Sequence, residues 1–259
     1  MYGALNDKLL ETVRLGKLNK VSYLLNLGAD INARDDFGKS VLMLASNVDM
    51  VELLINKGAN VEAKDYNGRR PLMYARDEKI AELLLKNSAK VNVRDDVKRT
   101  ALMWAVSREV MTVLVDNGGN VFEKDLFGNT ALMLVRDKDA AKFLIESGLS
   151  VDEENAYGKT ALMMCRDESI ARVLIENGAD IRRKDKDMIN VLMNVVGCGG
   201  DEKIVKFLIE SGADVNEVDK NGDDVIKFAK DEKVIEVLRK YIKPKKIKFL
   251  WQDNNIPRW

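Results

Sequence analysis

Apolar residues recur along this chain at a fixed step of 30 residues. A Leu-Met pair opens six successive apolar segments, and a glycine ends the following apolar segment of most units at the same step. The pairs are Leu42-Met43, Leu72-Met73, Leu102-Met103, Leu132-Met133, Leu162-Met163 and Leu192-Met193; the glycines are Gly28, Gly58, Gly118, Gly148 and Gly178, with Ser88 filling one place. Self-similarity at a step of this length predicts a repeat architecture.

Each unit predicts two helices. The residues around Leu72 and Ala75 predict a first helix of about two turns, which is too short to be stable alone in water. The second segment has apolar residues at helical spacing, as in Ile80, Leu83 and Leu84, and the glycine after it predicts a left-handed stop. An aspartate one residue before the second helix predicts its N-cap. These caps are Asp77, Asp137, Asp167, Asp201 and Asp231.

The stretch from each glycine to the next Leu-Met pair contains a turn signal. Asp-x-x-Gly, a hairpin-type turn, begins at Asp35, Asp65, Asp125 and Asp219. No single unit can bury its apolar faces, whereas a stack of units can. The sequence therefore predicts an all-α repeat solenoid of eight stacked helix pairs with β-hairpin-like finger turns.

In register, the Gly-Ala-Asp/Asn-Val/Ile, Asp-x-x-Gly and Leu-Met motifs resemble the ankyrin repeat from about Asp7 to about Tyr241. The resemblance implies a solenoid over residues 1–242, with an N-terminal capping repeat at 1–27, about seven further repeats, and a separate tail at 243–259. Two features depart from the family. Five consecutive repeats have 30 residues instead of 33, and Met replaces the His of Thr-Pro-Leu-His-x-Ala. Because Met fills irregular gaps readily, we expect this Met stripe to be core.

Composition excludes much enzyme chemistry. The chain has no His and two Cys, so His triads and four-thiolate zinc sites are impossible. Cys165 occupies a core position taken by Ala75 and Ala105 in other repeats, so we expect it to be packed. We expect a non-enzymatic protein with no cofactor and no metal. The few cysteines, the lack of a signal peptide and the lack of a long apolar run favour a cytoplasmic protein with no membrane span. We also expect a monomer.

The finger tips carry apolar residues where polar ones are expected: Phe37, Tyr66, Val97, Leu126, Phe127 and Tyr157. In ankyrin repeats the tips and the exposed face of the first helix form a concave partner-binding groove. The resemblance places Tyr74, Trp104, Leu134 and Met164 on its floor, followed by Arg76, Arg136 and Arg166. Aromatic and Arg side chains dominate binding hot spots. These residues predict binding of another protein, as an adaptor or an inhibitor. The alternative is that each tip aromatic packs on the adjacent finger.

Two segments leave other functions open. Gly197-Cys198-Gly199-Gly200 is inserted in one repeat and predicts a long loop. It is either a drifted repeat near the C-terminal end or the site of a ligand- or redox-responsive regulator that uses Cys198. Residues 239–259 have seven basic residues and one acid, against 35 basic and 41 acidic residues in 1–238. This tail, with Phe249, Trp251 and Trp259, could cover the last repeat, contact a partner, or bind nucleic acid or an anionic membrane. We expect little nucleic-acid binding, because the acidic body opposes it.

Overall fold

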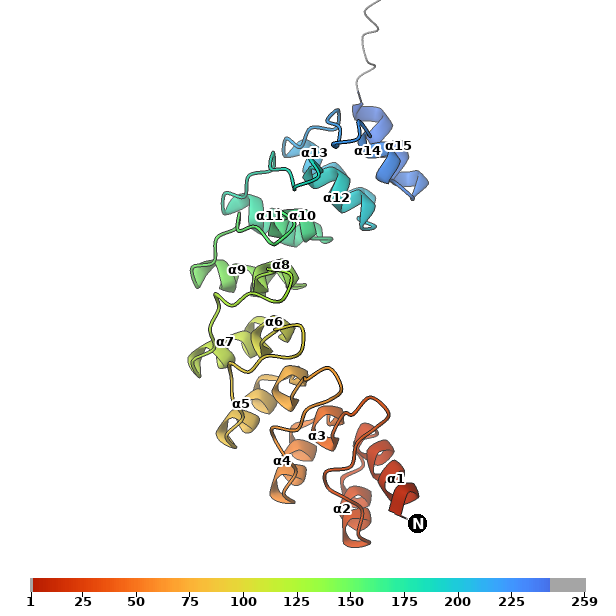
Figure 1. Ribbon diagram of the computed structural model, residues 1–259, viewed down its shortest axis with the longest axis vertical. Helices are drawn as coiled ribbons and strands as arrows, with labels where there is room; N and C mark the ends of the chain where they lie inside the picture. Colours follow the sequence, from red (N-terminus) through yellow and green to blue (C-terminus); the bar gives the residue numbers. More distant parts are fainter. Residues whose placement is uncertain (1, 243–259) are drawn as a thin grey trace, which may run out of the picture.

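A computed structural model, which describes residues 2–242, shows a crescent built from eight consecutive helix pairs (Figure 1). The first helices of the pairs, here called inner helices, are α1 (Tyr2–Arg14), α3 (Val41–Leu44), η1 (Pro71–Tyr74), α6 (Ala101–Trp104), α8 (Ala131–Leu134), α10 (Ala161–Met164), α12 (Val191–Gly197) and α14 (Val225–Phe228). The outer helices are α2 (Leu18–Asn26), α4 (Val48–Asn56), α5 (Glu78–Lys86), α7 (Arg108–Asp116), α9 (Lys138–Glu146), α11 (Glu168–Glu176), α13 (Glu202–Glu210) and α15 (Glu232–Tyr241). Within residues 2–242 there is no β-strand, so the predicted all-α solenoid is confirmed.

The outer helices begin at the predicted aspartates and end at the predicted glycines. Asp77 accepts hydrogen bonds through Oδ1 from the backbone N–H groups of Lys79 and Ile80. At the other end of the outer helix in the preceding repeat, Gly58 has φ +86° and donates its N–H to the carbonyl of Ile55. All five predicted aspartate caps accept such bonds. The local signals therefore fix both ends of these helices.

The regular inner helices are shorter than predicted. Six of them contain four residues, which is about one turn and not two. In the third repeat Ala75 already has extended geometry (φ −66°, ψ 118°), so the helix ends at Tyr74. Only three residues separate Tyr74 from the start of α5, and one of them must serve as its cap. The missing residues of the 30-residue repeat therefore remove a helical turn as well as part of the connection.

The core is one continuous apolar layer between the inner and outer helices. The six Met residues of the Leu-Met pairs are at most 7% exposed, so the prediction that the Met stripe is core is confirmed. Substantial contacts between helices occur only within a repeat or between adjacent repeats. Each repeat is thus stabilised by its immediate neighbours, as expected of a solenoid. No helix among residues 2–242 is long and apolar enough to cross a bilayer.

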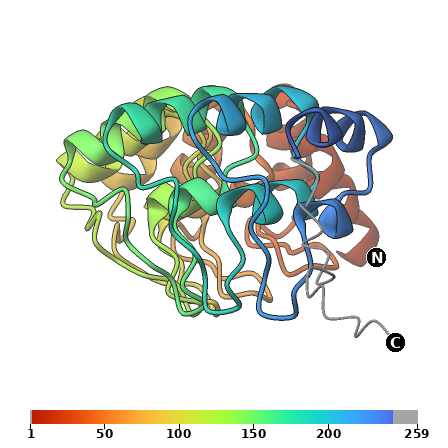
Figure 2. The ribbon, with the colours of Figure 1, turned by 90° about the horizontal axis from the view of Figure 1, so that it is seen from above.

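The fingers form a continuous layer along one side of the helices (Figure 2). Each finger closes through its own turn, for example by donation from the Gly38 N–H to the Asp35 carbonyl at 2.9 Å. Adjacent fingers are joined by six backbone hydrogen bonds of 2.8–3.2 Å, the first of which runs from the Tyr66 N–H to the Phe37 carbonyl. Where the turn lacks glycine, Lys98 and Met188 adopt the same positive φ. The hairpin character is limited to isolated bridges such as Arg34 to Ser40.

The insertion at residues 197–200 does not form the long loop that the sequence suggests. It lengthens the inner helix of that repeat, because α12 runs for seven residues, from Val191 to Gly197. Gly199 then adopts φ +84° and ends the helix. A Cβ on Gly200 would lie 2.4 Å from the Val195 side chain, so the connection to α13 is packed against α12. The prediction of a long loop was therefore wrong, although Gly197, Cys198 and Gly199 are exposed.

Candidate functional site

The concave floor is made by the last residue of each short inner helix. The first three residues of η1, α6, α8 and α10 are buried, whereas their last residues, Tyr74, Trp104, Leu134 and Met164, are only partly buried. A cavity of about 420 Å³ contains Tyr74, Trp104 and Leu134 in its wall, and an adjoining cavity of about 310 Å³ contains Leu134 and Met164. The four predicted floor residues therefore line one continuous groove, named here the concave groove.

Buried aspartates at the finger stems hold the two aromatic floor residues in place. Asp65 Oδ2 accepts a hydrogen bond from the Tyr74 hydroxyl at 2.6 Å, and Asp95 Oδ2 accepts one from Trp104 Nε1 at 3.0 Å. The other oxygen of each carboxylate accepts backbone N–H groups two and four residues further on. The turn aspartate thus orders its finger and orients the ring nine residues later. Burial, and next the bond to Asp65, raise the pKa of Tyr74 to about 12.

Arginines from two fingers stack on Trp104. The Arg69 guanidinium lies 4.0 Å from the centre of the indole ring, and that of Arg99 lies 5.2 Å from it. The same arginines reach buried carboxylates of the next finger: Arg69 Nε is 3.8 Å from Asp95 Oδ2, and Arg99 Nε is 3.0 Å from Asp125 Oδ2. Cation–π and ionic contacts together fix Trp104. The Trp104 ring is therefore held in the groove wall by contacts within the protein, and its face is covered by Arg69.

Three further groove residues, Lys39, Arg69 and Arg99, were not predicted from the sequence; all three follow the turn glycine position. Lys39 Nζ lies 5.0 Å from the centre of the Tyr74 ring, and all three side chains line the larger cavity. A signal was present, because the Lys39–Tyr74 and Arg69–Trp104 contacts join residues of adjacent repeats that are 35 positions apart. Arg99 and Trp104 are instead five positions apart in one repeat. Such a cross-repeat spacing is recognisable once the register of one repeat on the next is known.

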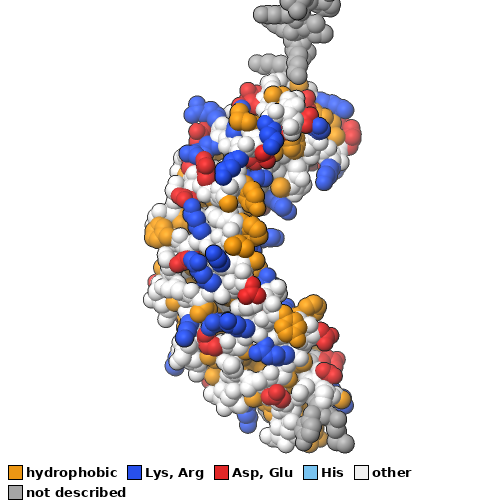
Figure 3. Space-filling model, viewed as in Figure 1, with side chains coloured by type: hydrophobic (Ala, Val, Ile, Leu, Met, Phe, Trp, Pro, Cys, Tyr) orange, Lys and Arg blue, Asp and Glu red, His pale blue; other side chains and the backbone are white. Residues whose placement is uncertain are grey.

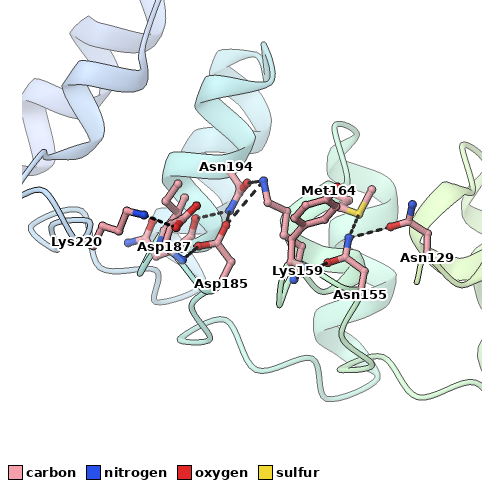
Figure 4. A network of polar contacts seen from close by, with 11 residues as sticks. Asn129, Asn155, Lys159, Met164, Asp185, Asp187, Asn194 and Lys220 are labelled. Carbon is pink, nitrogen blue, oxygen red and sulfur yellow. Dashed lines mark hydrogen bonds and ion pairs between the residues drawn. The ribbon is translucent and has the colours of Figure 1, made fainter. Parts of the chain in front are cut away.

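The same positions carry a different network at the C-terminal end of the groove (Figure 4). Asn155 takes the place of the aspartate and donates its side-chain amide to Asn129 Oδ1 at 2.8 Å and to the Met164 sulfur at 3.7 Å. Lys159 of the same finger reaches the next repeat, where its Nζ donates to Asn194 Oδ1 at 2.6 Å and lies 3.8 Å from Asp185 Oδ2. Polar side chains therefore link successive repeats along the whole groove.

The finger tips are exposed but lie outside the two cavities. Tyr66 is the most exposed of them at 73% and Phe127 the least of the exposed tips at 40%, whereas Val97 is partly buried. Tyr66 nevertheless lies over Gly38 of the preceding finger, where an added Cβ would be 2.6 Å from its ring. Packing on a neighbour and exposure to solvent thus coexist. The predicted tip set forms the rim beside the groove and does not line it; its exposed members are Phe37, Tyr66, Leu126, Phe127 and Tyr157.

The three predicted arginines follow the inner helices and are exposed. Arg76 and Arg136 line the larger cavity, and Arg136 and Arg166 line the smaller one. None of the three has a side-chain ion pair or hydrogen bond with another residue of 2–242. The structure therefore gathers these arginines with the floor residues into one site. Figure 3 shows Lys and Arg side chains together with apolar ones on the hollowed side of the crescent.

The other candidate residues do not form a site in the described chain. Cys165 is buried, donates to the Leu162 carbonyl at 3.1 Å, and has its pKa raised by burial to about 12, so its predicted packing role is confirmed. Cys198 is exposed at the end of α12. Among residues 2–242 no cluster of three or more Cys, Asp or Glu could hold a metal ion. Phe249, Trp251 and Trp259 lie outside the described residues.

The fold and groove define a helical repeat solenoid with a concave surface, and comparison with known families agrees. Residues 9–95 and 102–185 match a family model of ankyrin repeats in three copies, and residues 190–220 match the single ankyrin repeat. The chain belongs to the ankyrin repeat family. A comparison with curated proteins found no match. Ankyrin repeats are generally protein–protein interaction modules and are typically non-enzymatic.

Proposed function

We propose that this protein binds a partner protein through the concave groove and the adjoining finger tips, as an adaptor or an inhibitor without catalytic activity of its own. The observation that carries the proposal is the run of exposed aromatic and aliphatic side chains on successive finger tips beside the groove. Contiguous exposed apolar side chains on a folded protein mark interaction surfaces. The scaffold supports this role, because the six bonds between fingers hold the tips in a fixed order.

The test should change the tips and leave the groove wall intact. Trp104→Ala is a poor choice, because it removes the ring on which Arg69 and Arg99 stack. Phe127→Ala with Tyr157→Ala removes two exposed rings from the rim. The matched control is Tyr23→Ala with Phe122→Ala, which removes two rings that are 61% and 64% exposed and are not on finger tips.

The experiment is affinity capture from a lysate of the source organism with the wild type and both double variants. We expect a protein retained by the wild type and by the Tyr23/Phe122 control, and lost with the Phe127/Tyr157 variant. Retention of the same proteins by all three would refute the assignment of the finger tips. Thermal unfolding of the variants shows whether each one is folded, so that loss of binding can be assigned to the surface.

A further inference from the structure

The floor of the concave groove is basic, although the repeat body is acidic. Six cationic residues and a single acid, Asp167, line the two cavities. Residues 1–238 as a whole contain 35 basic and 41 acidic residues. The groove is therefore positively charged, although the repeat body as a whole carries a net negative charge. An arrangement of this kind favours a negatively charged ligand at that surface and steers it there.

Some cationic side chains of the groove already have carboxylate partners within the protein, and others do not. Arg69 and Arg99 are paired with buried carboxylates of the fingers. Arg76, Arg136 and Arg166 are exposed and have no ionic or hydrogen-bonded partner among residues 2–242. The single acid of the lining is already engaged, since Asp167 Oδ1 accepts the backbone N–H groups that begin α11. Three arginines therefore remain to pair with a ligand.

The three arginines stand in a row along the groove. They occupy the same position in their repeats, two residues after η1, α8 and α10, and these inner helices pack on one another in order through α6. Packed helix axes are about 8–10 Å apart, which places Arg76 roughly 16–20 Å from Arg136 and Arg136 roughly 8–10 Å from Arg166. At about 3.3 Å per residue, an extended chain covers these gaps with about five to six and about three residues.

An apolar residue interrupts the row. Val106 has the position of the arginines in the repeat between Arg76 and Arg136, lines the same cavity, and is 47% exposed. A ligand that follows the groove would meet positive charge, an apolar side chain, and then positive charge twice. The pattern fits a polypeptide with acidic side chains separated by an apolar one.

We infer that the concave groove binds an acidic segment of a partner protein in an extended conformation, with carboxylates on Arg76, Arg136 and Arg166 and an apolar side chain on Val106. This inference rests on the proposed function and names the chemistry of the partner. The chain's own residues 243–259 are excluded as the occupant by charge, since they contain five basic residues and one acid. A second copy is folded into helix pairs over residues 2–242 and so offers no extended acidic segment to the groove.

Nucleic acid fits the groove less well than an acidic peptide. Single-stranded nucleic acid needs free aromatic faces on which bases can stack. Here Arg69 already lies over Trp104 and Lys39 over Tyr74. The net negative body would also repel a continuous line of phosphates beyond the groove. An acidic peptide of about ten residues places its charges only within the row of arginines.

The experiment is selection of a random-peptide display library on the full chain. It is repeated on the groove variant Arg76→Glu/Arg136→Glu/Arg166→Glu and on a control, Lys20→Glu/Lys79→Glu/Lys138→Glu, which makes the same change in net charge on exposed residues of the outer helices. A milder variant with the three arginines changed to Gln tests the groove without reversing its charge. Circular dichroism and thermal unfolding show that each variant is folded.

We expect peptides from the wild type and the control to contain two acids about three residues apart, a third about five to six residues away, and an apolar residue in the wider gap. Their affinity should fall at least about tenfold with the Gln variant and further with the Glu variant, and fall as salt is raised. Groove-dependent peptides without acidic residues would overturn this inference while leaving the proposed function standing. Enrichment that is the same on all variants would overturn this inference, and the Phe127→Ala/Tyr157→Ala variant then tests the proposed function separately. A single-stranded oligonucleotide that displaces the selected peptides at lower concentration than the peptides themselves would overturn it in favour of nucleic acid.

Discussion

Asn155 donates its side-chain amide to Asn129 Oδ1 at 2.8 Å, at the place where the preceding pair of repeats has the ion pair between Arg99 and Asp125. Both asparagines are at least 92% buried. The two positions therefore differ together between repeats. Arg99 pairs with Asp125 in one pair of repeats, and Asn129 pairs with Asn155 at the same positions in the next. A neutral pair avoids an unpaired charge, which would be costly in a buried place.

The matching predicts a positive coupling between these positions. Asn129→Arg alone should lower the free energy of unfolding, because the arginine faces a neutral amide. Asn129→Arg combined with Asn155→Asp should recover stability, by about 0.5–3 kcal/mol relative to the sum of the single changes. Urea unfolding of the wild type, both single variants and the double variant measures the coupling. Simple additivity would show that the two side chains act independently.

Replacing Met188 with glycine should raise the free energy of unfolding. It adopts φ +62° at the position where most finger turns have glycine, and its side chain is 48% exposed. A residue with a Cβ in this conformation costs about 1–2 kcal/mol, so Met188→Gly should raise the unfolding free energy by about 1 kcal/mol. Met188→Ala is the matched control, because it removes the side chain and keeps the strain. Equal urea midpoints for the two variants would contradict this explanation.

Tyr74 predicts a late step in alkaline titration. Its pKa is raised from 10.0 to about 12 by burial and by the bond to Asp65. A raised folded-state pKa means that the protonated phenol stabilises the fold; this contribution is complete below pH 10 and is lost as the pH rises towards 12. Tyrosinate absorbance should therefore show a step towards pH 12 that belongs to Tyr74. In Tyr74→Phe the late step should be absent; if it persists, it belongs to another tyrosine.

The two cysteines should differ sharply towards a thiol reagent. Cys198 is exposed, whereas Cys165 is buried and its pKa is raised to about 12 by burial and next by the nearby Asp167. Because the thiolate is the nucleophile, one thiol should react in the folded protein and the second only after unfolding. Cys198→Ser should abolish the fast reaction. A fast reaction that remains in Cys198→Ser would mean that the core around Cys165 opens readily.

Local signals predicted most of the fold. Aspartate caps and glycine stops depend on residues close in sequence, and they set the ends of the outer helices as expected. The length of the inner helices was mispredicted, because apolar content alone does not reveal that Ala75 must be extended to reach the cap at Asp77. The lengthened α12 shows the converse, since the longer connection to α13 lets the helix continue through Val195 and Val196 to Gly197.

The groove was predicted only in part. Tyr74, Trp104 and the three arginines were placed correctly in one groove, because they hold equivalent positions in each repeat. The stacking of Arg69 on Trp104 could not be anticipated, since it depends on the register between adjacent repeats. The domain limits, the monomeric state, the cytoplasmic location and the roles of Phe249, Trp251 and Trp259 stay predictions.

The unbroken line of six hydrogen bonds between fingers has a mechanical consequence. Because each repeat contacts only its neighbours, a pulling force applied to the two ends would pass through every repeat in series. The crescent could first straighten by small rotations between repeats, opening the groove before any helix unfolds. Pulling on the ends would then weaken binding in the groove, and a bound segment would make the solenoid harder to straighten.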